Sequence, residues 1–360
     1  MTRRSSFLML PSTLLFCFSI FQIFCSSRKN IGRTKEETEI FLRSFNNIFQ
    51  RHQLKPTVSL CTLAKDEEAY IDEWVDYHFS LGFSEILIYD NSITNELAFW
   101  KSESRLSDPR IEIVHWPFVG QHREALHHCA KRSIEKNHTW CGVFDGDEFL
   151  VLRKHTNVIS FLEDHLHSGA LSLNWYFFGD SNQSVYTPYP VTKRFTMRQP
   201  TVNRHVKSFV KLANLKLDHL IESHFPYLVN STQHDTNNNT FFGPFNPDGP
   251  SDVAVINHYW TKSKKEFHHK GCVRGIVDVV NKSSKENLGK CGVHLHLPDC
   301  TVFDNSAWLQ FCSRVPRYRM FDLGTDWITN WLSSESVLHD ILTMALNEIL
   351  KLCVQEREMR

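Results

Sequence analysis

The stretch that most constrains this chain is WCGVFDGDEFLVL, from Trp140 to Leu152, which places three carboxylates in four residues between two apolar runs. The apolar runs favour burial, whereas like charges at close range oppose one another's ionisation. A divalent cation would offset this repulsion, because carboxylates are ligands that Mg²⁺ and Mn²⁺ prefer. Gly146 permits a tight turn that aims Asp145 and Asp147 at one point. The stretch therefore predicts a metal site.

A solvated turn is the alternative, because Asp-Gly is a common hairpin signal on protein surfaces. A surface hairpin would more often alternate apolar and polar residues. The uninterrupted apolar run Phe149–Leu152 after the turn thus favours a buried setting.

From Thr57 onward the pattern alternates between strands and helices. We predict four strands and two helices in this part: strands at Val58–Ala64, Glu85–Tyr89, Ile111–Val114 and Trp140–Phe144, and helices at Asp66–Leu81 and Gln121–Glu135. The order β-α-β-β-α-β predicts an α/β fold of Rossmann-like type, with a mostly parallel sheet flanked by helices.

Polar residues follow three of these strands directly. They are Lys65 and Asp66 after the first strand, Asp90 to Ser92 after the second, and the Asp145–Asp147 turn after the fourth. Ligands of open α/β sheets bind at the carboxyl ends of the strands. We therefore expect these residues to converge on one site.

The second half of the chain is less regular. We predict three further strands, an exposed loop rich in Asn, Gly and Pro, and a closing helix: Ala170–Trp175, Val206–Leu212 and Val253–Asn257, then Asn230–Pro250, then Glu335–Cys353.

The amino-terminal segment Phe7 to Cys25 carries no charge over 19 positions. A helix of that length spans about 28 Å, close to the hydrocarbon core of a bilayer. We predict a single-pass membrane anchor, with a cleaved signal peptide as the alternative. The predicted organisation is a cytoplasmic tail at 1–6, the anchor at 7–25, a stem at 26–55 and a catalytic domain at 56–355. Basic residues flank the anchor on both sides, so charge does not fix its orientation.

Cysteines and glycosylation sequons favour a lumenal catalytic domain. Cys272, Cys291, Cys300 and Cys312 crowd the last third of the chain and suit one or two disulfides, with reduced buried thiols as the alternative. Their spacing matches no zinc pattern. Five Asn-x-Ser/Thr sequons occur, at Asn137, Asn182, Asn230, Asn238 and Asn281. Lys+Arg and Asp+Glu balance at 40 each, which argues against nucleic-acid binding through bulk positive charge.

Four motifs in this order resemble glycosyltransferase family 92 and the similar family 2-like glycosyltransferases: SLCTLAKDEEAYIDEWVDYHFSLGFSEILIYDNS, QHREALHHC, W-x-x-x-x-DGDEFL and INHYWTKSKKEFHHKGCVRG. The resemblance covers roughly Val58 to Arg274. It implies a GT-A fold that binds a nucleotide sugar and transfers the sugar to an acceptor, typically with a divalent metal. It also implies a single-pass Golgi protein.

The same resemblance assigns residues to roles. It implies a Mn²⁺ or Mg²⁺ site at Asp145, Asp147 and His258, with His205 and His224 as weaker rivals for His258. It implies that the donor, a UDP-sugar with galactose favoured, is bound by Lys65, Asp66, Asp90, Gln121, Asp145, Lys262, Lys270 and Arg274. The last three would hold the diphosphate, although a solvated basic face is the simpler reading of such a run.

The remaining predictions concern the acceptor, which we expect to be a glycan or glycoprotein. If the reaction inverts configuration, one general base suffices, and Asp180 is the first candidate and Glu148 the second. Trp175 and Tyr176 would stack a sugar ring or simply pack. Two other functions stay open: another metal-dependent phosphoryl or phosphodiester enzyme, and an inactive nucleotide-sugar-binding membrane protein.

Overall fold

The computed structural model describes residues 55–105, 108–247, 249–274, 299–319 and 321. The chain divides into one unit from Met1 to Lys55 and a second from Pro56 to Arg360. The predicted anchor, the stem before Lys55 and the predicted helix Glu335–Cys353 lie outside the described residues. Within the described ranges, no helix has the length and apolar character needed to cross a membrane.

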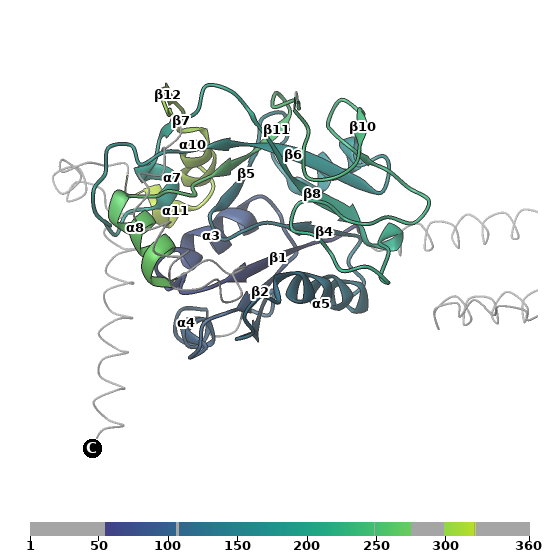
Figure 1. Ribbon diagram of the computed structural model, residues 1–360, viewed down its shortest axis with the longest axis horizontal. Helices are drawn as coiled ribbons and strands as arrows, with labels where there is room; N and C mark the ends of the chain where they lie inside the picture. The colour runs from purple at the N-terminus through teal and green to yellow at the C-terminus, as the bar shows by residue number, and fades with distance from the viewer. Residues whose placement is uncertain (1–54, 106–107, 248, 275–298, 320, 322–360) are drawn as a thin grey trace, which may run out of the picture. The chain divides into compact units, whose positions relative to one another are not determined.

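Strands and helices alternate along the first part of the second unit, and shorter elements follow. The elements are β1 Val58–Ala64, α3 Glu68–Ser80, β2 Glu85–Asp90, α4 Glu96–Ser104, β3 Ile111–His115, α5 His122–Glu135, β4 Trp140–Val143, β5 Glu148–Leu152, α6 Val158–His165, β6 Ala170–Phe177, α7 Val191–Arg194, β7 Met197–Arg198, β8 Asn203–Lys211, η1 Leu212–Asn214, β9 Gln233–His234, β10 Thr240–Phe241, β11 Ala254–His258, α8 Lys264–His268, η2 His269–Arg274, β12 Val302–Phe303, α10 Ser306–Cys312 and α11 Pro316–Arg319 (Figure 1).

The main sheet has two parts. Strands β3, β2, β1 and β4 lie side by side and run parallel, as predicted. Beyond β4, antiparallel β8 pairs with β4 and β6, and β11 runs parallel to β6 but antiparallel to β5. The α/β class and the mostly parallel sheet are thus confirmed, with antiparallel pairing where β8 meets β4 and β6 and where β11 meets β5. The register of β11 against β5 places His258 opposite Glu148, which brings two distant motifs together.

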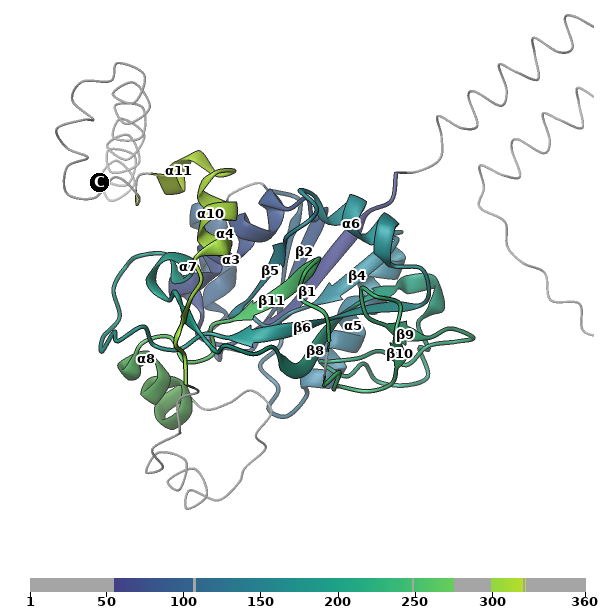
Figure 2. The same cartoon turned by 90° about the horizontal axis from the view of Figure 1, so that it is seen from above.

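Each face of the sheet is covered by helices because the buried strands carry apolar residues on both sides. Leu60 of β1 belongs to a core with Trp74 of α3, Phe161 of α6 and Phe311 of α10. Leu63 of β1 belongs to a second core against α5. Figure 2 shows α3 and α10 on one side of the strands and α5 on the other. The continuous burial of β1 is the pattern expected for a parallel strand covered on both faces.

A disulfide joins Cys61 of β1 to Cys129 of α5, at a sequence separation of 68. The sequence analysis did not anticipate this bond. The free thiol of Cys141 on β4 lies 3.5 Å from the Cys61 sulfur. Of the four cysteines considered for disulfides, Cys272 is disulfide-bonded, Cys300 and Cys312 are reduced, and Cys291 lies outside the described residues. The expectation of one or two disulfides in this group is thus confirmed at Cys272, and the alternative of reduced thiols holds for Cys300 and Cys312.

Other local differences have simple causes. Helices α4 and α6 were not predicted; α6 begins at Asn157, whose side chain accepts a hydrogen bond from the Ile159 amide. The expected loop at 230–250 contains the short strands β9 and β10. Four of the sequon asparagines are exposed and have left-handed backbone angles typical of turns, namely Asn137, Asn182, Asn230 and Asn238.

Candidate functional site

The turn between β4 and β5 holds its carboxylates through its own backbone. The Glu148 amide donates to the Asp145 carbonyl at 3.0 Å. The Asp145 amide donates in return to Glu148 Oε2 at 2.9 Å. The Tyr259 amide donates to the Asp147 carbonyl at 2.8 Å, which fixes the turn to the end of β11. The tight turn predicted at Gly146 is present, and these three hydrogen bonds hold it in place.

Lys207 neutralises one side of this turn. Its ammonium donates to Asp145 Oδ2 at 2.9 Å and lies 3.3 Å from Glu148 Oε2. The Lys207 side chain is 0% exposed, in the middle of β8. Burial opposes ionisation of Asp145, but the charges of Lys207 and His122 outweigh it and lower the pKa of Asp145 to about 2. Burial raises the pKa of Glu148, and Lys207 opposes that shift.

Lys270 and His258 flank the other aspartate. The Lys270 ammonium donates to Asp147 Oδ2 at 2.5 Å, and His258 Nε2 lies 3.4 Å from Asp147 Oδ1. Burial alone would raise the pKa of Asp147, but Lys270 and His258 hold it well below its usual range. The other nitrogen of His258, Nδ1, lies 3.8 Å from Glu148 Oε1. His258 therefore stands between two carboxylates.

Lys262 forms a third buried cation nearby. Its ammonium donates to Glu67 Oε2 at 3.1 Å and lies 3.3 Å from the centre of the Tyr70 ring. Burial lowers the pKa of Lys262, although the charges of Glu67 and Asp147 oppose that shift. Lys262 has φ of 52° and Asp66 has φ of 50°, both left-handed. Strained backbone of this kind persists where the surroundings enforce it, and it concentrates at functional sites.

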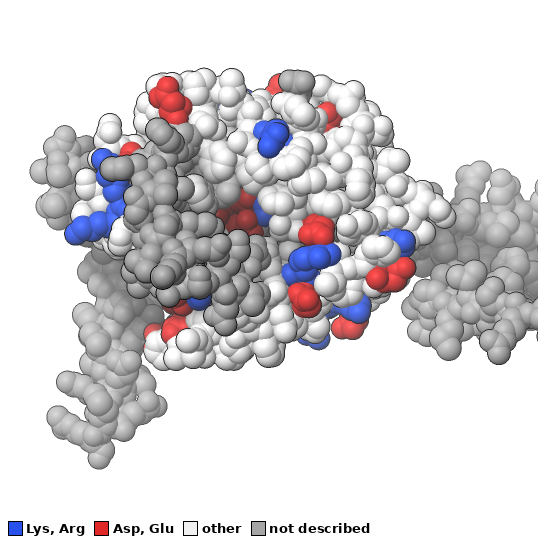
Figure 3. All heavy atoms as spheres, viewed as in Figure 1, with Lys and Arg blue, Asp and Glu red and all other residues white. Residues whose placement is uncertain are grey.

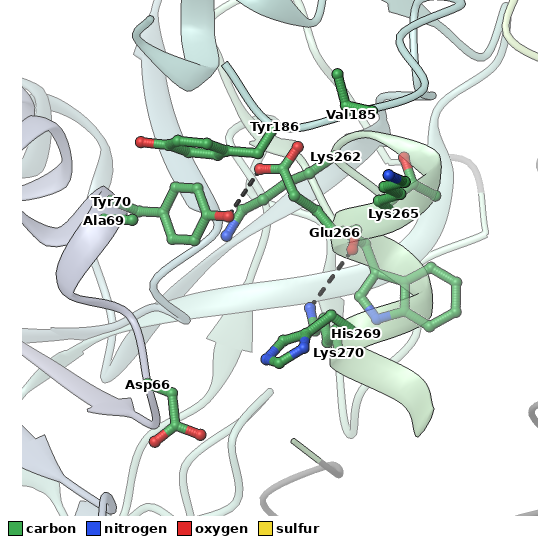
Figure 4. A pocket seen from close by; sticks show the side chains of 12 residues that line it. Asp66, Ala69, Tyr70, Val185, Tyr186, Lys262, Lys265, Glu266, His269 and Lys270 are labelled. Carbon is green, nitrogen blue, oxygen red and sulfur yellow. Dashed lines mark hydrogen bonds between the residues drawn. The ribbon is translucent and has the colours of Figure 1, made fainter. Parts of the chain in front are cut away.

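These residues border a cavity of about 480 Å³. We call it the lysine cavity, because its lining includes Lys262, Lys265 and Lys270; the other lining residues are Asp66, Ala69, Tyr70, Val185, Tyr186, Trp260, Thr261, Glu266 and His269. Figure 4 shows Lys262 beside the Tyr70 ring and Lys270 beside His269, with Asp66 at the opposite edge. Figure 3 shows acidic atoms at the bottom of a hollow near the middle of the molecule.

The residues predicted to bind the donor do not all lie at the same place in the structure. Asp66, Lys262 and Lys270 line the lysine cavity. Asp90 is fully buried, and its two oxygens accept the amides of Ser92 and Leu97 at 2.9 and 3.0 Å, which fixes the turn between β2 and α4.

The other predicted donor residues are less informative. Gln121 is exposed and caps the start of α5, and Lys65 is half-buried after β1. Arg274 ends η2, and its side chain lies outside what the structure describes.

The two candidate bases lie in contrasting places. Asp180 lies in the turn after β6, where Oδ1 accepts the Asn182 amide at 2.9 Å and Oδ2 lies 4.0 Å from Lys264 Nζ. It is absent from the described lining of the lysine cavity. Glu148 is fully buried behind His258. This burial favours a positioning role for Glu148, because a general base must reach the acceptor hydroxyl.

The aromatic residues proposed as sugar platforms pack instead. Trp175 and Tyr176 are buried. The Trp175 ring stacks on His205 with 5.0 Å between ring centres, and lies edge-on to His258 at 4.7 Å. His224 Nδ1 faces the Val206 carbonyl at 2.9 Å. This cluster supports His258 from behind, so His205 and His224 contact the site only indirectly.

The residues can be tested for their fit to a divalent cation. Among the described residues, no three His, Cys, Asp or Glu side chains converge as a metal-binding group. Asp147 and His258 approach each other, whereas the Asp145 carboxylate is turned toward Lys207. Glu148 Oε1 and His258 Nδ1 are buried without hydrogen-bond partners. A carboxylate–histidine pair backed by a second carboxylate is the donor chemistry of a metal site, so the residues fit.

Sequence reasoning missed Lys207, Glu67 and Tyr70. Lys207 had a usable signal, because a lysine within the apolar strand Val206–Val210 must be paired if the strand is buried. Glu67 lies directly before α3, where an acidic residue is common without any distant partner. Its partner Lys262 lies 195 residues away, and no local pattern announces that contact.

Comparison with known proteins shows the family of this chain. The chain matches glycosyltransferase family 92 over residues 55–271, more than half of its length, and it belongs to that family. Relatives called glycosyltransferase family 92 proteins occur in three plants. The one from Arabidopsis thaliana is 26% identical over 255 residues, covering 66% of this chain and 40% of its own length. The one from Ricinus communis is 28% identical over 244 residues, covering 64% and 40%.

A third relative, from Oryza sativa subsp. japonica, is 25% identical and covers 65% of this chain and 38% of its own length. The chain thus spans about two fifths of the length of the curated relatives it matches. Among solved structures, HddC from Yersinia pseudotuberculosis overlaps with a TM-score of 0.33 at 8% identity, covering 49% of this chain and 88% of HddC. An overlap that weak carries no argument here.

Proposed function

We propose that this chain is a metal-dependent glycosyltransferase that moves a hexose, with galactose favoured, from a UDP-sugar to a glycan or glycoprotein acceptor. Membership of family 92 supports the reaction class. The observation that carries the proposal is Asp147, held between His258 and Lys270, of which Lys270 lines the lysine cavity. These three residues come from two segments that meet only in the folded sheet.

The charge distribution suits the leaving group. As the bond from the sugar to the diphosphate breaks, negative charge grows on the phosphate oxygens, and preorganised cations stabilise it most in a partly buried site. Lys262 and Lys270 supply such charge, each fixed by a carboxylate that leaves further N–H donors available. A Mn²⁺ or Mg²⁺ ion held by Asp147, His258 and Asp145 would add Lewis-acid stabilisation of the same oxygens.

Glu148 orients His258 in this proposal. Its Oε1 faces His258 Nδ1, so the imidazole proton is directed there and Nε2 is left toward Asp147. For an inverting reaction, Asp180 remains the candidate base. Asp180→Asn should then lower kcat by about 10²–10⁴-fold with little change in donor binding. Retention of full activity in that variant would exclude the assignment.

The decisive experiment measures UDP release from UDP-galactose and other UDP-hexoses, with and without glycan acceptors, in Mn²⁺ and in EDTA. We expect release to require the metal and to be lost in Asp147→Ala by at least about 10²-fold. Asp252→Ala, an exposed aspartate paired with Lys154, is the matched control. Full activity in EDTA or in Asp147→Ala would refute metal-dependent transfer. Thermal stabilisation by UDP and Mn²⁺ without turnover would favour an inactive binding protein.

We also propose a single-pass membrane protein, Golgi-resident, with a lumenal catalytic unit. The Cys61–Cys129 disulfide supports an oxidising compartment. Exposure of Asn137, Asn182, Asn230 and Asn238 supports access to glycosylation enzymes. A mobility shift after N-glycosidase treatment of the full chain, made in eukaryotic cells, tests this arrangement. A chain with no glycan at any of these positions would count against it.

A further inference from the structure

A second cavity adjoins the lysine cavity. It measures about 280 Å³ and shares Ala69, Tyr70 and Tyr186 with its neighbour. We call it the tyrosine groove, because Tyr189 and Tyr318 line it beyond those shared residues. Figure 4 shows Tyr186 and Tyr70 facing each other at the edge of the lysine cavity. The two cavities thus adjoin at this tyrosine pair.

Two tyrosines of the groove are well exposed, whereas Tyr318 is buried. Tyr186 is 44% exposed and Tyr189 is 52% exposed, and both lie on the segment between β6 and α7. Tyr186 meets the edge of the Tyr70 ring, with 6.1 Å between ring centres, and Arg194 lies 5.2 Å from its centre. Exposed aromatic surface of this kind, next to a cavity, is typical of ligand-binding grooves.

The segment that carries these rings is fixed at both ends. Before it, the carbonyls of Gln183 and Ser184 accept the amides of Lys264 and Lys265 at 3.1 and 3.0 Å. After it, the fully buried Glu73 accepts the Val191 and Thr192 amides at 2.5 and 3.0 Å. The rings are therefore held in place before any ligand arrives, which lowers the entropic cost of binding.

The charges in the groove are already paired. Asp72 accepts Arg105 at 2.7 Å and Arg317 at 2.9 Å, and Glu73 is satisfied as described. The tyrosine groove therefore lacks the surplus of lysines found next door and does not suit a second polyanion. Tyrosine faces suit the apolar faces of pyranose rings, while phenol hydroxyls and the carboxylate of Asp72 can bond sugar hydroxyls.

We propose that the tyrosine groove binds the acceptor oligosaccharide, holding the one or two sugar units next to the unit that receives the hexose. The inference rests on the proposed transferase function and deepens it. The groove is slightly smaller than the ~300–1,000 Å³ of typical small-ligand sites, which suits a short stretch of glycan. Tyr186 then separates the donor side from the acceptor side.

A glycan array probed with the full chain and saturating UDP tests this. The array carries N-glycans with and without core fucose, polysaccharide fragments, and the corresponding monosaccharides. We expect oligosaccharides to bind better than monosaccharides. Tyr186→Ala and Tyr189→Ala should each weaken oligosaccharide binding about tenfold. Tyr189→Phe should keep most of it. Phe242→Ala, an exposed aromatic that lines neither cavity, is the control.

Unchanged oligosaccharide binding in both alanine variants would overturn the proposal, as would wild-type binding no better to oligosaccharides than to monosaccharides. UDP release without acceptor is measured in parallel. If an alanine variant loses UDP release to the same extent as glycan binding, the residue serves the donor site and the groove assignment falls. Failure of wild-type UDP release with every donor and acceptor tested would refute the transferase and leave the glycan-binding result standing, so the two failures are distinguishable.

Discussion

Lys207 and Lys270 each neutralise one aspartate of the same turn, but they do so from very different parts of the fold. Lys207 lies in the middle of β8, is fully buried and touches both Asp145 and Glu148. Lys270 lies on η2, outside the sheet, and is 19% exposed. A lysine held within a strand stabilises the fold, whereas a lysine on a helix outside the sheet can leave its carboxylate when a ligand binds. Asp147 is therefore the aspartate of the turn whose lysine partner a ligand can replace.

The largest expected effect is on stability, and it comes from Lys207. Lys207→Met removes the ammonium that pairs with the Asp145 carboxylate and lies beside the buried Glu148. Breaking a buried pair costs about 3–5 kcal/mol. Lys211→Met, on the same strand but partly exposed, is the matched control and should change the free energy of unfolding by less than about 0.5 kcal/mol. Urea unfolding monitored by tryptophan fluorescence measures both. Equally small losses of unfolding free energy in Lys207→Met and Lys211→Met would show that Lys207 stabilises the fold no more than its neighbour on the strand.

The second effect is on donor use, and it comes from Lys270. Lys270→Met should lower kcat/KM for the UDP-sugar by roughly 10–100-fold, because a charged hydrogen bond to the diphosphate is lost. Its free energy of unfolding should change by less than about 1 kcal/mol, since Lys270 is partly exposed and Asp147 keeps His258 beside it. Lys131→Met, exposed on α5, controls for loss of a positive charge. Strong destabilisation of Lys270→Met with an unchanged kcat/KM would contradict the distinction between Lys270 and Lys207.

A smaller effect concerns Glu266, which anchors the helix that precedes Lys270. Glu266 accepts two bonds from Arg194 and one from the Tyr70 hydroxyl. Burial raises the pKa of Glu266, but Arg194, Ser263 and Tyr70 together lower it to about 2. Because the folded pKa lies below the ordinary value, this stabilisation is present above about pH 4.5 and is lost as pH falls toward 2.

Glu266→Gln should therefore flatten the fall in the free energy of unfolding between pH 4.5 and 2, by at most about 3 kcal/mol. It should also raise the donor KM a few-fold, because α8 positions Lys270. Glu163→Gln, an exposed acid on α6, is the control. An acid-unfolding curve that is identical to wild type would show that Glu266 does not anchor α8.

The parallel half of the sheet could be predicted from sequence because its strands are continuous apolar runs, each followed by a polar end. The turn at Asp145 was predicted from its residues, and its meeting with His258 from the resemblance to family 92. Lys207 as a partner of Asp145, and Glu67 as a partner of Lys262, could not be predicted. Both contacts join distant segments, Lys207 to Asp145 at a separation of 62 residues and Lys262 to Glu67 at 195, and no local pattern in the chain indicates such contacts.

The thiol of Cys141 next to the Cys61–Cys129 bond has a practical consequence for handling the protein. In the folded state, burial raises the pKa of Cys141 to about 11, so little of the attacking thiolate exists at neutral pH. Unfolding returns this thiol to an ordinary pKa of about 8.5 within reach of the crosslink. Heated samples should then scramble their crosslinks and fail to regain structure, fastest in alkaline buffer, and an alkylating reagent added during heating should rescue recovery.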